Sequence, residues 1–229
     1  MIKGPLALLL LGIVVLQPEP SAALSFQEVD SRIQASDTAL KGALDMPERG
    51  IPKDLLRRCR GLAIFPAVLK VGLVLGVSFG KGIVLRRDEK TGQWNGPAFF
   101  TIRAGSVGLQ AGAQTTDLIL LVMNEEGVEG LLEDKFTLGA DVSVAAGPVG
   151  RVASAETNVR LESGILSYSR SKGLFAGFAL KGAELKPDQE ANEVYYGKGI
   201  TVQDVLYEGK GSISDNARLL LKNLEDATR

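Results

Sequence analysis

The sequence predicts an α+β fold: one strongly curved or barrel-like antiparallel sheet, with helices before it and after it in the chain. The middle of the chain, from Leu62 to about Lys181, consists of short apolar runs separated by glycines and polar turns, which is typical of strands. The two flanking regions instead repeat apolar residues at spacings of three and four, which indicates amphipathic helices. Because strands and helices do not alternate regularly, a parallel sheet is not expected.

Composition narrows the class of function. The chain has 229 residues, with 26 Lys and Arg against 27 Asp and Glu, so it lacks the net positive charge typical of nucleic-acid-binding proteins. It contains no histidine, which excludes Ser–His–Asp and Cys–His nucleophilic pairs and His-ligated zinc. The single cysteine, Cys59, cannot form an internal disulfide. We therefore expect a binding or structural protein with no cofactor, no metal and no nucleic-acid partner.

Residues 1–23 are predicted to be a secretory signal peptide. Lys3 precedes an apolar run from Leu6 to Leu16, and small residues stand where a signal peptidase cleaves. The run is too short to cross a hydrocarbon core of about 30 Å as a helix, although an uncleaved membrane anchor is the alternative interpretation. Cleavage after Ala23 would leave a single domain, residues 24–229, exported to the periplasm or the extracellular space.

Two helices are predicted to precede the sheet. Ser25 and Glu28 form a capping box, and apolar residues at helical spacing continue from there to Leu44. Pro52 suits the first turn of a second, short helix that runs through Arg60. Three arginines gather at the end of this helix: Arg57, Arg58 and Arg60. They either complement the helix dipole or form a basic collar for anionic lipid, and the sequence leaves both interpretations open.

The central region divides into short strands with one inserted helix. The predicted strands are Leu62–Phe65, Gly72–Phe79, Gly82–Arg86, Ala98–Arg103, Val107–Gln114, Leu118–Met123, Asp141–Ala146, Ile165–Ser169 and Leu174–Leu180. A polar hairpin turn is expected at Asp88–Gly92, and a short helix, Glu125–Glu133, is expected to be capped by Asn124. The tail is predicted to be helical over three further ranges: Asp188–Tyr195, Thr201–Tyr207 and Asp215–Leu224.

Glycine makes up 27 of the 229 residues, which is more than usual, and its placement follows a pattern. Gly72, Gly76, Gly80 and Gly82 are separated by even numbers of residues, so in an extended chain they share one face. Glycine inside a strand costs packing and entropy, so this repetition indicates a geometric need. Either the sheet bends sharply there, or one of the protein's own helices or a ligand chain lies flat against the bare face.

The acidic residues offer only weak candidates for catalysis. Asp117 and Asp141 each border a strongly apolar strand, where a partly buried carboxylate could take part in a reaction. Structural roles are the more common outcome for such residues, either as an ion pair with Arg151, Arg170 or Lys172 or as acceptors of backbone N–H groups. We therefore predict that the protein is not an enzyme.

Five segments between Cys59 and about Tyr196 resemble the SYLF domain family. In order along the chain they are Arg60–Pro66, Trp94–Ala98, Thr116–Asn124, Phe136–Arg151 and Ser167–Gly177. The resemblance, over residues 59–196, implies phospholipid binding, with phosphoinositides as the ligands of eukaryotic members, and actin binding or bundling in the yeast relatives. It implies no enzymatic activity. Because an exported protein would not meet cytosolic actin, an anionic phospholipid of the cell envelope is the expected partner.

The resemblance and the basic residues together predict the site. We expect an amphipathic helix, Ser25–Leu44, and neighbouring basic side chains to contact an anionic lipid surface. The expected lipid-binding residues are Arg57, Arg58, Arg60, Lys70, Arg170 and Lys172. The alternative is a protein-interaction or self-assembly module that uses a sheet edge or the glycine face, as the actin-binding relatives suggest.

Overall fold

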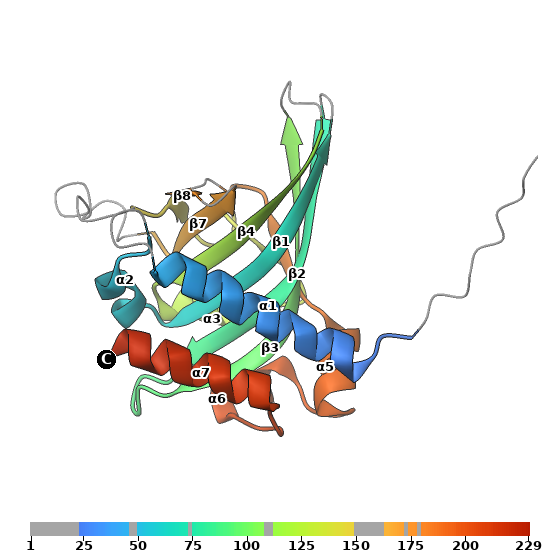
Figure 1. The fold of residues 1–229 in the computed structure, drawn as a ribbon, viewed down its shortest axis with the longest axis vertical. Helices are drawn as coiled ribbons and strands as arrows, with labels where there is room; N and C mark the ends of the chain where they lie inside the picture. The colour runs from blue at the N-terminus through green and yellow to red at the C-terminus, as the bar shows by residue number, and fades with distance from the viewer. Residues whose placement is uncertain are drawn as a thin grey trace, which may run out of the picture.

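The structure is a computed structural model that describes residues 23–45, 50–72, 75–107, 112–148, 163–171, 174–177 and 180–229. Most of the predicted signal peptide lies outside these ranges, as do Arg151 and Lys172. Within them, nine strands form one sheet, and helices precede and follow it in the chain (Figure 1). This arrangement confirms the predicted α+β class.

The strands, in chain order, are β1 (Gly61–Gly72), β2 (Leu75–Arg87), β3 (Trp94–Val107), β4 (Gly112–Val122), β5 (Phe136–Thr137), β6 (Val144–Ala146), β7 (Ile165–Ser171), β8 (Leu174–Gly177) and β9 (Glu184–Pro187). The helices are α1 (Phe26–Leu44), α2 (Lys53–Arg58), α3 (Glu125–Gly130), α5 (Gln189–Tyr196), α6 (Val202–Glu208) and α7 (Asp215–Thr228). The strand order is β5-β9-β3-β2-β1-β4-β7-β6, with β8 paired to β7. Among the described strands every pair is antiparallel except β6 and β7. None of the helices in the described ranges is long and apolar enough to cross a membrane.

The sheet curls into a half-barrel, which confirms the expectation of strong curvature (Figure 1). Phe136 of β5 and Val144 of β6 come from opposite ends of the strand order, yet both belong to one buried apolar cluster. An isolated bridge between Leu138 and Val142 joins the same two ends. We call the side of the sheet that holds this cluster the inner face, and the side that α1 and α7 cover the outer face.

The bend of the sheet explains the glycine pattern on β2. Gly80 and Gly82 lie on the inner face, beside a bulge that interrupts β1 between Ile64 and Leu69. A Cβ atom on Gly82 would lie 2.1 Å from the carbonyl oxygen of Ile64, so a larger residue cannot fit there unless β1 moves. Of the explanations that the sequence leaves open, sharp bending is therefore the one that applies at this position, because β1 itself fills the space.

The body of the sheet is buried on both faces because its strands carry two alternating sets of apolar residues. Leu62 and Ile64 on β1 pack outward beneath α1 and α7, whereas Ala63 and Phe65 pack inward, and all four are fully buried. Residues of α3 and α6 complete the inner cluster. Burial on both sides explains why the central strands contain almost continuous apolar runs.

Helix α1 begins as predicted and buries its apolar stripe. The Ser25 hydroxyl accepts a hydrogen bond from the Glu28 N–H, and the Glu28 carboxylate accepts one from the Ser25 N–H. Val29, Ile33 and Leu40 are fully buried between the sheet and α7. Because this stripe is already covered, α1 cannot present it to a lipid surface without leaving the core.

Two predicted strands are wrong because each extends across a reversal of the chain. In place of one strand at Gly72–Phe79, Gly72 ends β1, and β2 runs back beside it with Gly76 opposite Gly72. The predicted strand Val107–Gln114 likewise combines the last residue of β3 with the first residues of β4. Glycines and apolar residues continue through both reversals in the same pattern, so periodicity alone does not locate them.

Candidate functional site

Strands β1 and β2 continue beyond α1, and there their outer face is uncovered (Figure 1). We call this part, Leu69–Gly72 of β1 and Leu75–Phe79 of β2, the extension. Leu69 pairs with Phe79 and Val71 pairs with Val77, so four apolar side chains form two cross-strand pairs on one face. Their exposed fractions run from 37% for Phe79 to 64% for Val77. We call these four residues the outer patch, and exposed apolar clusters of this kind mark interaction surfaces.

Strands β1 and β2, which form the outer patch, contain cationic but no acidic side chains, whereas Arg103 on β3 lies in register with Glu184 on β9. No Asp or Glu occurs from Gly61 to Arg87 or from Trp94 to Thr116. Lys81 and Arg103 are exposed beside the patch, and the Arg103 guanidinium carbon lies 5.6 Å from the centre of the Phe79 ring. Within the described part of the chain, neither cation has an ion-pairing partner. The outer patch therefore combines apolar surface with positive charge.

Three of the predicted arginines do gather, at the opposite end of β1. Arg57, Arg58 and Arg60 line one hollow of about 440 Å³ beside α2. Part of their charge is already compensated, because Arg57 lies 3.2 Å from Asp54 and Arg60 is ion-paired with Glu89. Two of them stand in the last turn of α2, where positive charge complements the helix dipole. The dipole interpretation is thus supported, and lipid binding by this arginine cluster stays a prediction.

Lys70 does not join the arginine cluster. It stands near the far end of β1, ten positions after Arg60, which corresponds to roughly 30 Å along a strand. Its side chain lies on the inner face of the sheet, in register with Ser78 on β2 and Gln114 on β4. The structure thus places the predicted lipid contacts at opposite ends of the sheet, and Lys172 lies outside the described residues.

Arg170 has a structural position between α1 and the sheet. Its guanidinium donates two hydrogen bonds to one oxygen of Asp117, at 2.6 and 3.0 Å. It also lies so close to Gly42 of α1 that a Cβ there would be 2.0 Å from Nη1. The other Asp117 oxygen accepts from the Ala67 N–H, at the bulge of β1. The pair therefore braces α1, β7 and the bulge, which confirms the structural role predicted for Asp117.

The other reactive side chains are also accounted for structurally. The Asp141 carboxylate accepts from the Thr137 N–H at 2.6 Å and closes the turn after β5. Burial raises the pKa of the Cys59 thiol to about 12, so almost none of it is the nucleophilic thiolate at neutral pH. Among the described residues, no group of three or more His, Cys, Asp or Glu could hold a metal ion.

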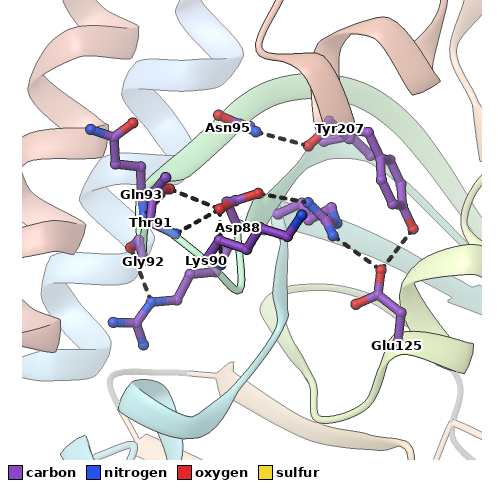
Figure 2. Close-up of polar contacts among 11 residues, drawn as sticks. Asp88, Lys90, Thr91, Gly92, Gln93, Asn95, Glu125 and Tyr207 are labelled. Carbon is purple, nitrogen blue, oxygen red and sulfur yellow. Dashed lines mark hydrogen bonds and ion pairs between the residues drawn. The ribbon is translucent and has the colours of Figure 1, made fainter.

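A partly buried polar cluster joins β2 to α3 and α6 (Figure 2). Arg86 lies 3.1 Å from Glu125, and its guanidinium carbon is 3.9 Å from the centre of the Tyr207 ring. The Tyr207 hydroxyl donates to the same Glu125 oxygen at 3.1 Å. Burial and the adjacent carboxylate raise the pKa of Tyr207 to about 12, which keeps the hydroxyl protonated as a donor. The cluster connects three elements, and we interpret it as a brace of the fold.

The outer patch is the candidate site that sequence analysis missed. Val77 and Phe79 alternate with small residues, and the same alternation is typical of a strand with one face in the core. The signal that could have distinguished them is the absence of acidic residues from the whole hairpin of β1 and β2, because surface strands usually carry both signs of charge.

The described residues form an α+β half-barrel domain that presents an exposed apolar patch with cations beside it. A sequence family described as "Ysc84: Las17-binding protein actin regulator" matches residues 103–227, which is more than half of the chain. The chain belongs to this family, which contains the SYLF domain, as the sequence resemblance predicts.

The relatives are longer proteins from fungi and mammals. Protein YSC84 of Saccharomyces cerevisiae is 36% identical over 178 residues, which cover 76% of this chain and 37% of the relative. LAS seventeen-binding protein 3 of the same species is 35% identical over 159 residues, covering 68% and 34%. The SH3 domain-containing YSC84-like protein 1 of Homo sapiens is 32% identical over 162 residues, covering 70% and 47%. The chain thus spans between about a third and a half of these relatives, and the name of one of them, LAS seventeen-binding protein 3, describes binding to another protein.

Proposed function

We propose that this protein is a non-enzymatic binding domain that attaches reversibly to anionic phospholipid surfaces through the outer patch. The observation that carries the proposal is the exposure of large apolar side chains on strands that contain cations and no acids. The apolar side chains would enter the interfacial region of a bilayer, while Lys81 and Arg103 contact the phosphate groups. The proposed ligand, an anionic phospholipid, is the one that the sequence predicts, but the proposed contact is the outer patch rather than α1.

Burial favours the outer patch over α1 as the contact. The apolar stripe of α1 is buried in the core, so its use would expose the sheet beneath it at a cost of about 25 cal/mol per Å². The outer patch is exposed already and requires no such rearrangement. The arginine cluster at the other end of β1 is a second candidate contact, which the same experiment tests separately.

The expected affinity is modest and sensitive to salt. Each basic side chain near an anionic surface contributes about 1 kcal/mol, and a patch of four partly exposed side chains adds a limited apolar area. Replacement of Lys81 or Arg103 by Gln should therefore weaken binding about fivefold each. Binding should also decrease as salt is raised, because the Debye length shortens from about 10 Å at 0.1 M to about 3 Å at 1 M.

Vesicle co-sedimentation of the full chain tests the proposal. Vesicles of phosphatidylcholine alone are compared with vesicles that also contain phosphatidylglycerol. Val77→Asp should abolish binding to the anionic vesicles, because it places a negative charge in the outer patch. Leu219→Asp, which changes another exposed aliphatic residue on α7, should leave binding unchanged. Equal binding to both kinds of vesicle, or full binding by Val77→Asp, would contradict the proposal.

The arginine cluster is tested with a triple variant in the same assay. Replacing Arg57, Arg58 and Arg60 together by Gln should leave vesicle binding within about twofold of the wild type if the outer patch is the main contact. Loss of binding in this variant, with binding retained by Val77→Asp, would move the contact to the end of α2.

We also propose that the chain is exported and that the membrane it meets belongs to the cell envelope. The support is the sequence pattern of residues 1–23, in which a basic residue precedes an apolar run and small residues precede the expected cleavage site. N-terminal sequencing of the protein recovered from its host should find a chain that begins at Leu24. A recovered chain that retains residues 1–23 would contradict cleavage.

A protein partner is the second candidate function, and the family match favours it. The family description names Las17 binding and actin regulation. In this case the outer patch would cover a complementary protein surface or a second copy of the chain. Light scattering during size exclusion and co-sedimentation with actin filaments test this function, and Val77→Asp should abolish either association. A protein that stays monomeric at every concentration and does not pellet with filaments would exclude both.

A further inference from the structure

The inner face of the extension holds a pocket that the functions above do not use. The pocket has a volume of about 220 Å³ and is lined by residues of β1, β2, β3, β4 and β7 together with Leu180. In the body of the sheet, the inner face is covered by the inner apolar cluster. The pocket marks the point at which this cover ends, while the strands continue toward the extension.

The strand register divides the pocket lining into a polar row and a mainly apolar part. The polar row, nearer the extension, contains Ser78 on β2, Lys70 on β1 and Gln114 on β4. The next row toward the body contains Ile102 on β3 and Val68 on β1, which both approach the bare inner face of β2, together with Thr116 on β4. A pocket that is charged at one end and mainly apolar at the other is suited to a ligand with the same division.

Lys70 supplies the charge at the polar end. Its side chain is half-buried, and no acid in the described ranges forms an ion pair with it. A partly desolvated ammonium group gains from a charge-assisted hydrogen bond with an anion, because that bond replaces lost hydration. The ligand group beside Lys70 should therefore be negatively charged.

The volume limits the apolar part of the ligand to one chain. A water molecule takes up about 30 Å³ in the liquid, and a methylene group is of similar size, so the pocket encloses about seven methylene groups of one chain, and the end of a longer chain such as that of decanoate would extend beyond it. Pockets for larger ligands begin at about 300 Å³. Leu118 and Leu180 line the apolar end, where the chain would lie.

We propose that the inner pocket binds a single-chain anionic amphiphile, such as a medium-chain fatty acid, with its anionic group at Lys70. The chain lies against Val68, Ile102 and the two leucines toward the body of the sheet. This site is separate from the outer patch, because the two lie on opposite faces of the same strands. It does not depend on the attachment of the protein to a bilayer.

Isothermal titration of the full chain with three probes tests the charge requirement, with decanoate kept below the concentration at which it forms micelles. Decanoate should bind, decanol should bind at least tenfold more weakly, and acetate should show no binding. Lys70→Gln should lower the affinity for decanoate about tenfold without changing that for decanol, whereas Lys222→Gln, at an exposed position on α7, should change neither. Equal affinity for decanoate and decanol, or no effect of Lys70→Gln, would overturn the proposal.

A pocket-filling pair of variants tests the location. Ala104 lines the pocket in register with Ser78, whereas Ala113 is exposed on the outer face of β4. Ala104→Phe should abolish decanoate binding, and Ala113→Phe should leave it unchanged, with circular dichroism used to check that each variant folds. Unchanged decanoate binding by folded Ala104→Phe would overturn the location. If Ala104→Phe does not fold, the location is tested by whether Lys70→Gln lowers the affinity for decanoate.

A variant that disrupts the pocket should not affect binding at the outer patch, and a variant that disrupts the outer patch should not affect binding in the pocket. Val77→Asp should lose vesicle binding and keep decanoate binding, and Ala104→Phe should do the reverse. Loss of both activities in either folded variant would overturn the assignment of two sites. Lysophosphatidylglycerol, titrated in place of decanoate, distinguishes the source of the ligand: binding of both probes supports a site for any single-chain anion, and binding of decanoate alone restricts it to fatty acids.

Discussion

The body of the sheet and its extension are built from the same strands, yet the same side-chain pattern has different outcomes in the two regions. On β2, Ile83 and Val77 lie on the same face because an even number of residues separates them. Ile83 is fully buried in the apolar core between the sheet and α1, whereas Val77 is mostly exposed. The helices make the difference, since they cover the body and leave the extension bare (Figure 1). Apolar residues in the body therefore stabilise the fold, and those in the extension are available for binding.

The largest expected effect is on stability, from truncating one residue in each region. Ile83→Ala should lower the free energy of unfolding by about 2 to 5 kcal/mol, because it leaves a cavity in the core. Val77→Ala should change it by less than about 0.5 kcal/mol. Urea unfolding followed by circular dichroism measures both. Equal destabilisation by the two variants would show that the extension is packed against something in solution.

A second comparison uses glycines of neighbouring strands. Gly82→Ala should destabilise the protein by about 1 to 3 kcal/mol, because its Cβ would meet the backbone of β1. Gly105→Ala, on β3 beside Val77, should be neutral or stabilise by up to about 1 kcal/mol, because no atom lies within 4 Å of the added Cβ. Thermal unfolding of both variants checks this, and a neutral Gly82→Ala would show that β1 can move away easily.

A third comparison uses arginines. Arg86→Met should lower the free energy of unfolding by about 1 to 2 kcal/mol, because Glu125 and Tyr207 lose their cationic partner in a partly buried cluster. Arg103→Met, in the exposed region, should have an effect below about 0.5 kcal/mol. Urea unfolding at one pH and ionic strength measures both. If the two variants were equally stable, the cluster in Figure 2 would not be a brace.

The smallest effect is expected from a comparison of two cysteines, which measures how accessible each thiol is to a reagent rather than how stable the protein is. Burial raises the pKa of Cys59 to about 12, so at pH 8 it should not react with a thiol reagent while the protein is folded. Val77→Cys should react within seconds to minutes, because that position is exposed. Rapid labelling of wild-type Cys59 without unfolding would contradict the burial.

The raised pKa of Cys59 also predicts a dependence of stability on pH. The folded state keeps the thiol protonated, whereas in the unfolded chain it ionises near pH 9. The contribution of the protonated thiol is therefore complete below about pH 9 and decreases as the pH rises from 9 toward 12. Cys59→Ala should remove this part of the decrease above pH 9, as urea midpoints measured at several pH values would show.

Local signals predicted much of the fold. The capping residues Ser25 and Asn124 begin helices where the sequence places them, because a cap is satisfied by residues only a few positions away. The shared face of the glycines on β2 also follows from their spacing, but the sequence left open whether a bend or a covering element explains them, and only the position of β1 against Gly82 decided it. The limits of the strands could not be predicted, because apolar alternation continues through the reversals between β1 and β2 and between β3 and β4.

The candidate site was less predictable, because it depends on contacts between distant residues. Arg170 was expected to be available to lipid, but the fold brings Asp117 and Gly42 against it. Lys70 and Arg60 share one strand, yet they lie at its opposite ends and on different surfaces. Spacing along the chain does not report which side chains meet across the sheet.

By itself, the sequence determined the family, the α+β class, the helix starts and the alternation of side chains along each strand. These properties depend on neighbours within a few residues, or on segments that match the family in their order along the chain. Only the tertiary structure decided that α1 covers most of β1 and β2 and leaves the extension exposed. Burial depends on packing between elements far apart in the chain, and therefore the same apolar pattern forms core in the body of the sheet and an exposed surface in the extension.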